Sequence, residues 1–304
     1  MVIYRKRGFC HNDKFRAFLF YITKKRLPKE GFIVPLQSLI YLYNKITLNF
    51  RVTFLGTGTS MGVPVVGCKC EVCKSDDPRD TRTRTAILLQ SDTTTVVIDA
   101  GPDFRQQVLR ENLTKIDAIV LTHEHRDHIA GLDDIRPFNI WQDAAMPIYA
   151  NDAVETVIKR EYHYAFGENR YPGGPRFDLK TIDKHAKFTI GDLDFQAIEI
   201  LHGSLPILCY RIQNFTYITD CKTISAVEFE KIIGTKILVI NALHHKGHYS
   251  HLNLEEALEM IERINPERAF LIHSSHSMGK YADIQPTLPE NVTLSYDGLH
   301  YNYL

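Results

Sequence analysis

The sequence predicts one α/β domain over residues 50–304, built from mixed sheets with much antiparallel pairing. Two observations lead to this prediction. Short apolar segments bounded by turn residues recur along the stretch, as at 51–55 and 94–98. Segments with helical spacing interrupt them at intervals, and the clearest is Leu254–Ile264, which Asn253 can cap. Runs of strands broken by helices indicate a mixed α/β chain, and we find no internal repeat.

The individual elements follow from the same two patterns. Strands are predicted at 51–55, 85–90, 94–98, 117–121, 195–201, 207–212, 215–219, 236–241, 268–272, 292–295 and 299–303. Helices are predicted at 102–112, 151–164, 225–233 and Leu254–Ile264. Asp297-Gly298 predicts a hairpin turn that pairs the last two strands. The role of the long segment 133–175 is left open between a lid, a dimer surface and core.

Residues 1–49 differ in charge from the rest of the chain. They hold ten Lys and Arg against Asp13 and Glu30, a net charge of +8, and because the whole chain is neutral the remaining residues carry −8. We expect 1–49 to be a poorly ordered basic extension, with a membrane-surface or RNA-binding arm as the alternative. The acidic body disfavours non-specific binding of nucleic acid.

The lengths of the apolar runs and the positions of the cysteines indicate the cellular compartment. The chain has no apolar run near the roughly 20 residues that a membrane span needs. Three of the six cysteines lie within 68–73, which favours metal binding in a reducing compartment over disulfides. We therefore expect a cytoplasmic protein that acts on a small molecule, without a membrane or nucleic-acid partner. A homodimer is left open.

The strongest motif in the chain is HEHRDH at 123–128. In an extended segment His123 and His125 point the same way, so both can reach one ion. The turn at Asp127 and His128 then offers two ligands to a second ion. Imidazole and carboxylate ligands suit zinc, manganese or iron. Four such side chains within six residues predict a metal site.

Three further candidates stand at the ends of predicted strands, where loops carry ligands. They are His202, Asp220 and His273. Each alone would more often be a surface or capping residue. The 123–128 cluster leaves its ions short of ligands, however, and so we predict that all three join it.

The order of these motifs resembles the metallo-β-lactamase-fold hydrolases. The resemblance covers residues 50–304 and includes Leu55-Gly56-Thr57-Gly58 and Val97-Ile98-Asp99-Ala100-Gly101 as well as the ligand candidates. It implies an α/β fold, the metallo-β-lactamase αββα sandwich of two mixed sheets with outer helices. It also implies that Asp99 orients metal ligands rather than binding metal.

The resemblance further implies how two divalent ions, zinc or manganese, would be bound. The ligands would be His123, His125 and His202 for the first ion, Asp127, His128 and His273 for the second, and Asp220 bridging both. Asp127 is also assigned as a catalytic residue. The redox di-iron members would have Glu in place of His125, and bacterial zinc β-lactamases would have Cys in place of Asp220. A bridging carboxylate suits phosphodiester hydrolysis, because it holds two cations near the charge that develops on phosphate oxygens.

A second metal site is predicted at Cys68, Cys70 and Cys73, three thiolates within six residues. A structural zinc needs a fourth ligand, and His276 is the candidate; reduced thiols without metal are the alternative. This combination resembles the phosphoribosyl 1,2-cyclic phosphate phosphodiesterases of phosphonate breakdown, the PhnP type. The loop 63–73 and the Tyr217-x-Thr219-Asp220 segment resemble them too.

A histidine-rich segment, 244–251, precedes the helix at Leu254–Ile264. Related phosphodiesterases keep a non-ligand histidine just before this helix, and His251 is best placed for that role, with His248 as the alternative. Such a histidine would bind a phosphate oxygen or protonate the leaving alkoxide, because its usual pKa lies near neutral pH.

The resemblance thus implies a phosphodiesterase in which two metal ions share a hydroxide that attacks phosphorus. The implied substrates are small cyclic phosphodiesters, such as a ribose 1,2-cyclic phosphate bearing a 5-phosphate. One alternative is a tRNA 3′-processing nuclease, which would carry an inserted arm and lack the cysteine site. A second is a metalloprotein of the pyrroloquinoline quinone biosynthesis type, which has a comparable cysteine loop. A third is a non-catalytic zinc-binding module.

Overall fold

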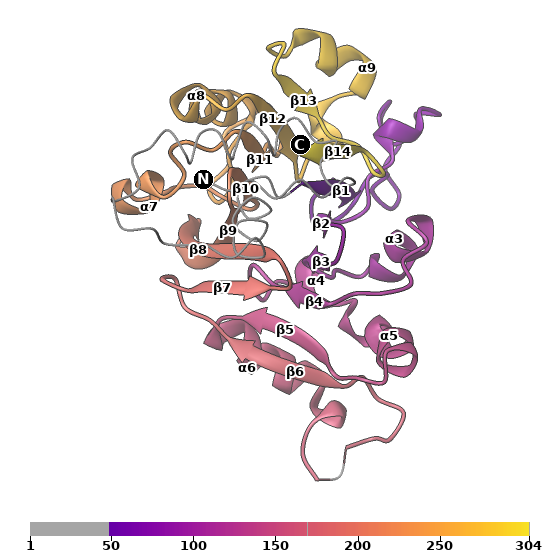
Figure 1. The fold of residues 1–304 in the computed structure, drawn as a ribbon. Coiled ribbons are helices and arrows are strands. Elements are labelled where there is room, and N and C mark those ends of the chain that lie inside the picture. The colour runs from indigo at the N-terminus through magenta and orange to yellow at the C-terminus, as the bar shows by residue number, and fades with distance from the viewer. Residues whose placement is uncertain (1–48, 169, 304) are drawn as a thin grey trace, which may run out of the picture. The chain divides into compact units, whose positions relative to one another are not determined.

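Two seven-stranded sheets face each other in the computed structural model, which describes residues 49–168 and 170–303 (Figure 1). The first sheet consists, in spatial order, of β14 (His300–Tyr303), β1 (Phe50–Gly56), β2 (Ala86–Gln90), β3 (Thr95–Ile98), β4 (Ala118–Val120), β5 (Met146–Ala150) and β6 (Phe177–Thr181). The second consists of β13 (Val292–Leu294), β12 (Arg268–Ile272), β11 (Ile237–Asn241), β10 (Phe215–Ile218), β9 (Leu205–Ile212), β8 (Leu193–His202) and β7 (Lys187–Ile190).

Both sheets are mixed. In the first, β14, β1, β2 and β3 pair antiparallel and β3 to β6 pair parallel. In the second, β7 to β10 pair antiparallel and β10 to β13 pair parallel. Parallel neighbours such as β3, β4 and β11 are buried on both faces, which explains their nearly continuous apolar sequence.

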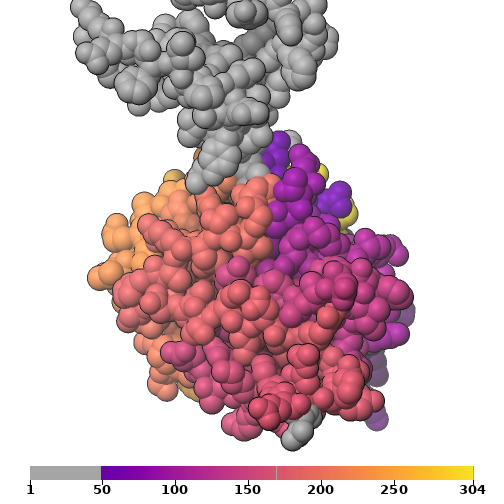
Figure 2. Space-filling view, turned by 60° about the horizontal axis from the view of Figure 1, so that its bottom comes forward, coloured from indigo at the N-terminus to yellow at the C-terminus, as the bar shows by residue number. Residues whose placement is uncertain are grey.

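Helices cover the outer faces of the two sheets, so the predicted αββα sandwich is confirmed. The helices are α3 (Phe104–Arg110), α4 (Arg126–Ile129), α5 (Arg136–Trp141), α6 (Asp152–Glu161), α7 (Ala226–Glu230), α8 (Leu254–Ile264) and α9 (Tyr281–Ile284). Helices α3 and α5 lie outside the first sheet, and α7 and α8 lie outside the second (Figure 1). The space-filling view shows the same division, with residues coloured purple on one side and orange on the other (Figure 2).

Large aromatic side chains fill the space between the sheets. Phe54 on β1 packs against Phe270 on β12 with ring centroids 5.2 Å apart, and Phe50 packs against Phe215 at 5.7 Å. Such ring pairs contribute roughly 0.5–1.5 kcal/mol beyond the area they bury. One further apolar cluster lies between the first sheet and its helices, and another lies between the second sheet and its helices. This packing on both faces of the sheets holds the strand ends that carry the site residues in place.

Helix α8 forms as predicted. The Asn253 side chain accepts from the Glu256 N–H, and the Glu256 carboxylate accepts in return from the Asn253 N–H, which completes a capping box. Leu254, Ala257 and Ile261 lie on the buried stripe. At 11 residues α8 is the longest helix that the structure describes, and neither it nor any other described helix could span a bilayer.

The predicted C-terminal hairpin is wrong. β13 pairs parallel with β12 in the second sheet, whereas β14 pairs antiparallel with β1 in the first. The chain crosses between sheets at Asp297, whose carboxylate accepts from the N–H and hydroxyl groups of both Thr57 and Thr83. These four hydrogen bonds tie the segment to β1 and β2 and take the place of a hairpin turn. Strands β5, β6 and β7 were not predicted, and β5 lies within the segment 133–175 that was left open.

Arg82 is a buried charged residue close to this crossing. Its guanidinium donates to the Thr57 hydroxyl and the Ser295 carbonyl. The extension predicted for 1–49 lies, apart from Asn49, outside the described residues. Its disorder and the domain boundary stay predictions.

Candidate metal and active site

Four strand ends bring the predicted ligands together. The 123–128 motif follows β4 in the first sheet, His202 is the last residue of β8, and Asp220 and His273 follow β10 and β12. Because β10, β11 and β12 run parallel, their carboxyl ends meet at one edge of the second sheet. Every residue predicted to bind the two ions therefore lies at one end of the sandwich.

The first group of ligand candidates contains only histidines. One ligand nitrogen from each of His123, His125 and His202 lies within 4.8 Å of the others. His123 Nε2 and His125 Nδ1 are 3.0 Å apart. His202 Nδ1 donates to the Ser250 carbonyl at 2.9 Å, which leaves its Nε2 free to face the group.

The second group contains Asp127, His128 and His273, again within 4.8 Å. Asp127 Oδ2 lies 3.3 Å from His128 Nε2 and 3.7 Å from His273 Nε2. Asp220 extends between the histidines, with Oδ2 at 3.3 Å from His128 Nε2 and Oδ1 at 3.1 Å from His273 Nε2. Asp220 also groups with His123, so it reaches both sets of ligands.

The protonation states of these side chains suit a cation. Burial lowers the pKa of His123 and His125, which keeps both imidazoles neutral with a lone pair available. Burial alone would raise the pKa of Asp127 and Asp220, but the neighbouring histidines lower both below the usual range. The same carboxylates raise the pKa of His128 despite its burial, so a metal ion there would replace the proton on its Nε2. Neutral imidazoles at His123 and His125 beside ionised carboxylates are a donor set that divalent transition metals prefer.

Unpartnered nitrogen atoms support the same reading. His128 Nε2 and both ring nitrogens of His273 are buried and have no hydrogen-bond partner among the described residues, although carboxylate oxygens lie close by. Buried polar atoms without partners are uncommon in folded proteins. A cation between the carboxylates and the two Nε2 atoms would satisfy His128 Nε2 and His273 Nε2, so the residues present fit the implied metal.

Asp99 and Thr122 contact the ring nitrogens of His128 and His123 that face away from the predicted metal. The Asp99 carboxylate accepts from His128 Nδ1 at 2.8 Å and from the Thr122 N–H and hydroxyl at 2.9–3.0 Å. The contact to His128 agrees with the orienting role implied for Asp99. Thr122 was not singled out in the sequence, and its position just before the histidine motif was the only available signal.

Gly101 lies directly beneath the motif, and a Cβ there would come within 2.0 Å of the Asp127 carbonyl. We therefore expect Gly101→Ala to lower the free energy of unfolding by about 3 kcal/mol, at the upper end of overpacking effects. Gly247→Ala is the matched control, since nothing lies within 4 Å of its Cβ. Urea unfolding of chelator-treated protein measures both, and equal stability of the two variants would contradict the prediction.

His251 joins the ligand cluster from the side. Its Nε2 lies 3.0 Å from Asp220 Oδ1, and its Nδ1 faces the Ser250 hydroxyl at 3.0 Å and His248 Nδ1 at 3.2 Å. Burial lowers the pKa of His251 to about 4, against the opposing effect of the hydrogen bond that its Nε2 donates to Asp220. His248 contacts His251 but none of the predicted ligands by a hydrogen bond among the described residues.

A cavity of about 420 Å³ opens onto this cluster. His125, Asp127 and His251 line its floor together with other ligand candidates. Met61 and Tyr249 are well exposed and stand among the lining residues. The cavity has the size of a small-molecule site.

The three loop cysteines gather around His276, as predicted. Its Nδ1 lies 3.3 Å from Cys68 Sγ, 3.4 Å from Cys70 Sγ and 3.4 Å from Cys73 Sγ. A tetrahedral zinc with bonds of about 2.3 Å to sulfur and about 2.0 Å to nitrogen would separate these atoms by roughly 3.5 Å. The four side chains therefore fit a zinc ion, although the zinc itself stays a prediction.

A hydrogen bond to the Cys70 sulfur from the Cys73 N–H helps to lower the pKa of Cys70 to about 6, while burial raises that of Cys73 to about 11. We expect Cys73→Ser to remove one equivalent of zinc and to make the loop 63–73 sensitive to protease, because the metal ties that loop to the His276 turn. Cys209→Ala, a buried thiol outside the cluster, should keep its zinc. Plasma emission analysis and limited trypsin digestion test this, and unchanged zinc in Cys73→Ser would refute it.

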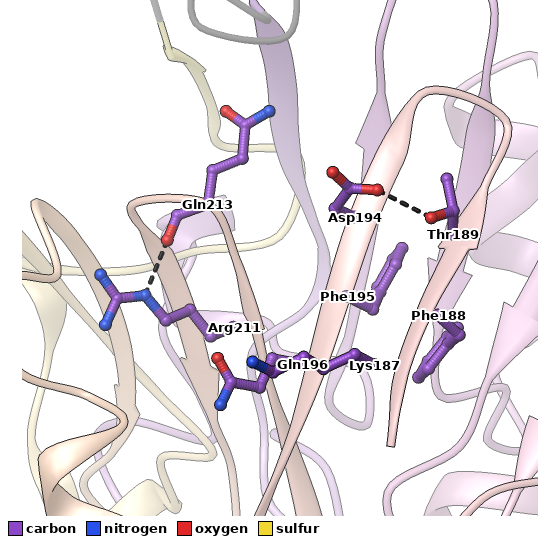
Figure 3. Close-up of a pocket in the computed structure, with 8 residues that line it drawn as sticks. All are labelled: Lys187, Phe188, Thr189, Asp194, Phe195, Gln196, Arg211 and Gln213. Carbon is purple, nitrogen blue, oxygen red and sulfur yellow. Dashed lines mark hydrogen bonds between the residues drawn. The ribbon is translucent and has the colours of Figure 1, made fainter. Parts of the chain in front are cut away.

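A second hollow of about 420 Å³ is lined by residues of β7, β8 and β9 and by Gln213, which follows β9 (Figure 3). Several of its polar groups are engaged with one another or with the backbone. Thr189 donates to Asp194, and the Arg211 guanidinium donates to the carbonyls of Gln213, Lys231 and Ile233. It contains no metal-competent cluster among the described residues, so we place the functional site at the histidine cluster.

Comparison with known families matches residues 94–274 to the model of the beta-lactamase superfamily domain. That span includes all seven ligand candidates of the histidine cluster. Together with the two-sheet fold, it defines a hydrolase of the metallo-β-lactamase fold.

A solved structure described as a new diphosphatase from the PhnP family is 37% identical to the chain, with a TM-score of 0.79. The match covers 84% of this chain and 98% of that one. The chain therefore belongs to the PhnP family of the beta-lactamase superfamily.

Two curated relatives match over part of their length. An octanoyltransferase of Porphyromonas gingivalis strain W83 is 41% identical over 82% of this chain and 51% of its own length. The coenzyme PQQ synthesis protein B of Rhodopseudomonas palustris strain TIE-1 is 32% identical over 36% of this chain and 38% of its own length. The chain thus spans about half or less of these relatives.

Proposed function

We propose that the protein is a metal-dependent phosphodiesterase that hydrolyses a small phosphodiester, with cyclic ribose phosphates as the substrate class. The observation that carries the proposal is the position of Asp220. Its carboxylate lies within 3.3 Å of ring nitrogens of His128, His251 and His273, so one anionic group connects the ligand clusters with the candidate proton donor.

The proposed metal ligands are the seven residues assigned from the sequence. They are His123, His125, Asp127, His128, His202, Asp220 and His273. Two divalent ions, zinc or manganese, would supply a water of lowered pKa and positive charge against the developing phosphate oxyanions. His276 and the three loop cysteines would hold a structural zinc.

The chain's own residues then divide the remaining work. Asp127 lines the cavity and has the more exposed carboxylate of the two aspartates, so it can orient the attacking water by accepting a hydrogen bond from it. His251 Nε2 lies 3.0 Å from Asp220 Oδ1, and it carries the proton for the leaving oxygen. A bound phosphate anion next to it would raise its low pKa and so favour the protonated form.

A substrate screen with defined metals tests the proposal. Chelator-treated protein is reloaded separately with zinc and manganese, then offered ribose 1,2-cyclic phosphate, bis(p-nitrophenyl) phosphate, a precursor tRNA and an octanoyl thioester. The thioester is included because of the Porphyromonas gingivalis relative's name. We expect metal-dependent turnover of the two phosphodiesters. The proposal would be overturned by faster cleavage of the tRNA or the thioester, or by oxygen consumption without hydrolysis. Turnover that continues at the same rate with chelator present would also overturn it.

The leaving-group role of His251 makes a separate prediction. We expect His251→Gln to lower kcat by about 100-fold on ribose 1,2-cyclic phosphate, whose alkoxide needs a proton, as is typical for loss of a general acid. On bis(p-nitrophenyl) phosphate the loss should stay below about tenfold, since p-nitrophenolate leaves without protonation. His248→Gln distinguishes the two candidate histidines. An equal loss on both esters in His251→Gln would argue for a purely structural role.

A further inference from the structure

His276 belongs to two sites at once. Its Nδ1 faces the sulfur atoms of Cys68, Cys70 and Cys73 at 3.3–3.4 Å. The same ring lines the cavity of about 420 Å³ that opens onto the histidine cluster. The cysteine site and the substrate cavity therefore share one imidazole as part of their common wall.

A zinc ion on Nδ1 fixes where the ring carries its proton. A neutral imidazole has one N–H, and with Nδ1 bound to metal that proton must be on Nε2. Metal-bound histidines almost always donate this second N–H to a protein acceptor or to water. Among the described residues, no protein group accepts from His276 Nε2. The donor is therefore free for a ligand in the cavity.

The groups around His276 indicate what that ligand presents. Hydroxyl-bearing residues line the cavity with it: Thr59, Ser60, Ser275 and Ser277. None of the described lining residues is Lys or Arg. Three thiolates and one divalent zinc also leave a net charge of −1 behind the ring. A wall of neutral donors in front of a negative centre suits hydroxyl or ring oxygens better than a second phosphate.

We propose that His276 is a substrate-binding residue as well as a zinc ligand: its Nε2–H, in the cavity that Ser60 and Ser277 also line, binds an uncharged oxygen of the sugar portion of the substrate. The cysteine zinc thereby acts on substrate selection and not only on loop stability. This inference rests on the proposed function only in taking the cavity as the substrate site.

The proton position is tested on the native protein, so no variant needs to fold. Protein labelled with ¹⁵N-histidine and loaded with zinc should show His276 with metal on Nδ1 and the proton on Nε2 from pH 6 to pH 9. Ribose 5-phosphate should shift that N–H resonance, and inorganic phosphate should shift it less. A proton on Nδ1, or an N–H that ribose 5-phosphate does not perturb, overturns the proposal.

Kinetic discrimination tests the binding role. His276→Cys can keep a four-cysteine zinc site while removing the N–H. We expect kcat/KM for ribose 1,2-cyclic phosphate, relative to bis(p-nitrophenyl) phosphate, to fall about tenfold, the value of one hydrogen bond to substrate. His185→Cys, the same change at an exposed histidine outside the cavity, should leave that ratio unchanged.

The outcomes separate the two proposals. Native protein that hydrolyses neither ester contradicts the proposed function, while the nuclear magnetic resonance experiment still decides the position and accessibility of the N–H. An unchanged ratio in a His276→Cys variant that retains its zinc contradicts the binding role alone. If the variant loses its zinc, the native-protein measurement decides.

Discussion

Asp220→Ala is expected to lower phosphodiesterase turnover by about 1000-fold or more, because the carboxylate both holds metal charge at the reaction centre and orients the groups around it. Asp220 is almost fully buried and lies 3.0–3.3 Å from ring nitrogens of His128, His251 and His273. Its loss leaves those nitrogens without their common anion. At least one bound metal ion should be lost with it.

Metal analysis and turnover should be measured together on this variant. Asp220→Asn keeps the size but removes the charge, and we expect it to retain more of the fold's stability than alanine while losing a similar fraction of turnover. Asp92→Ala, an exposed aspartate away from the cluster, controls for loss of one negative charge. A folded Asp220→Ala protein with native metal content and full turnover would refute the two-metal proposal.

The geometry of the site depends on unusual backbone conformations. Asp99, Asp220 and His273 all have positive φ angles, of 66°, 54° and 60°. Non-glycine residues adopt this left-handed region infrequently, and such conformations concentrate at functional sites. Asp99 and His273 directly follow a buried strand, and Asp220 comes two residues after one, so the turn redirects each side chain from the strand direction toward the cluster. Packing of the strands holds these conformations in place.

The sequence predicted the sandwich because most strands carry their own signal. Segments such as Ile237–Asn241 and Arg268–Ile272 are short, apolar and bounded by turn residues, and the structure confirms them. β6 (Phe177–Thr181) and β7 (Lys187–Ile190) were missed because they lie at sheet edges and carry polar, partly exposed residues. The hairpin at Asp297 was mispredicted because a local turn signal cannot reveal a distant set of donors at Thr57 and Thr83.

The candidate metal ligands were easier to predict from the sequence than the residues that position them. Ligand-forming side chains are chemically distinctive, so their clustering in sequence and at strand ends was readable. Thr122 contributes its N–H and hydroxyl to Asp99, and Ser250 contributes its backbone carbonyl to His202. These groups are common along any sequence and do not mark a site. The close approach of Gly101 to the Asp127 carbonyl likewise depends on packing of two loops. Such contacts are set by tertiary structure and leave no local pattern.

Asp99→Asn is the sharpest test of these supports. Asp99 is fully buried, accepts from His128 Nδ1 at 2.8 Å and also accepts from Thr122. An asparagine offers one acceptor oxygen and one NH₂ group. If the amide oxygen still accepts from Thr122, the NH₂ group faces His128 Nδ1 and donates to it. The imidazole proton then lies on Nε2, which is the nitrogen proposed to bind the metal. We expect the affinity for the second metal ion and kcat each to fall by about 10–100-fold.

Calorimetric titration of chelator-treated protein with manganese measures the affinity directly. Asp117→Asn provides the matched control, because Asp117 also accepts a backbone N–H, that of Thr95, but lies outside the cluster. Its metal affinity should equal that of the native protein. Native affinity in a folded Asp99→Asn variant would mean that the ligand set alone orients His128. A loss confined to Asp99→Asn would instead establish that the buried carboxylate, through the tautomer it selects, decides whether the cluster can bind its second ion.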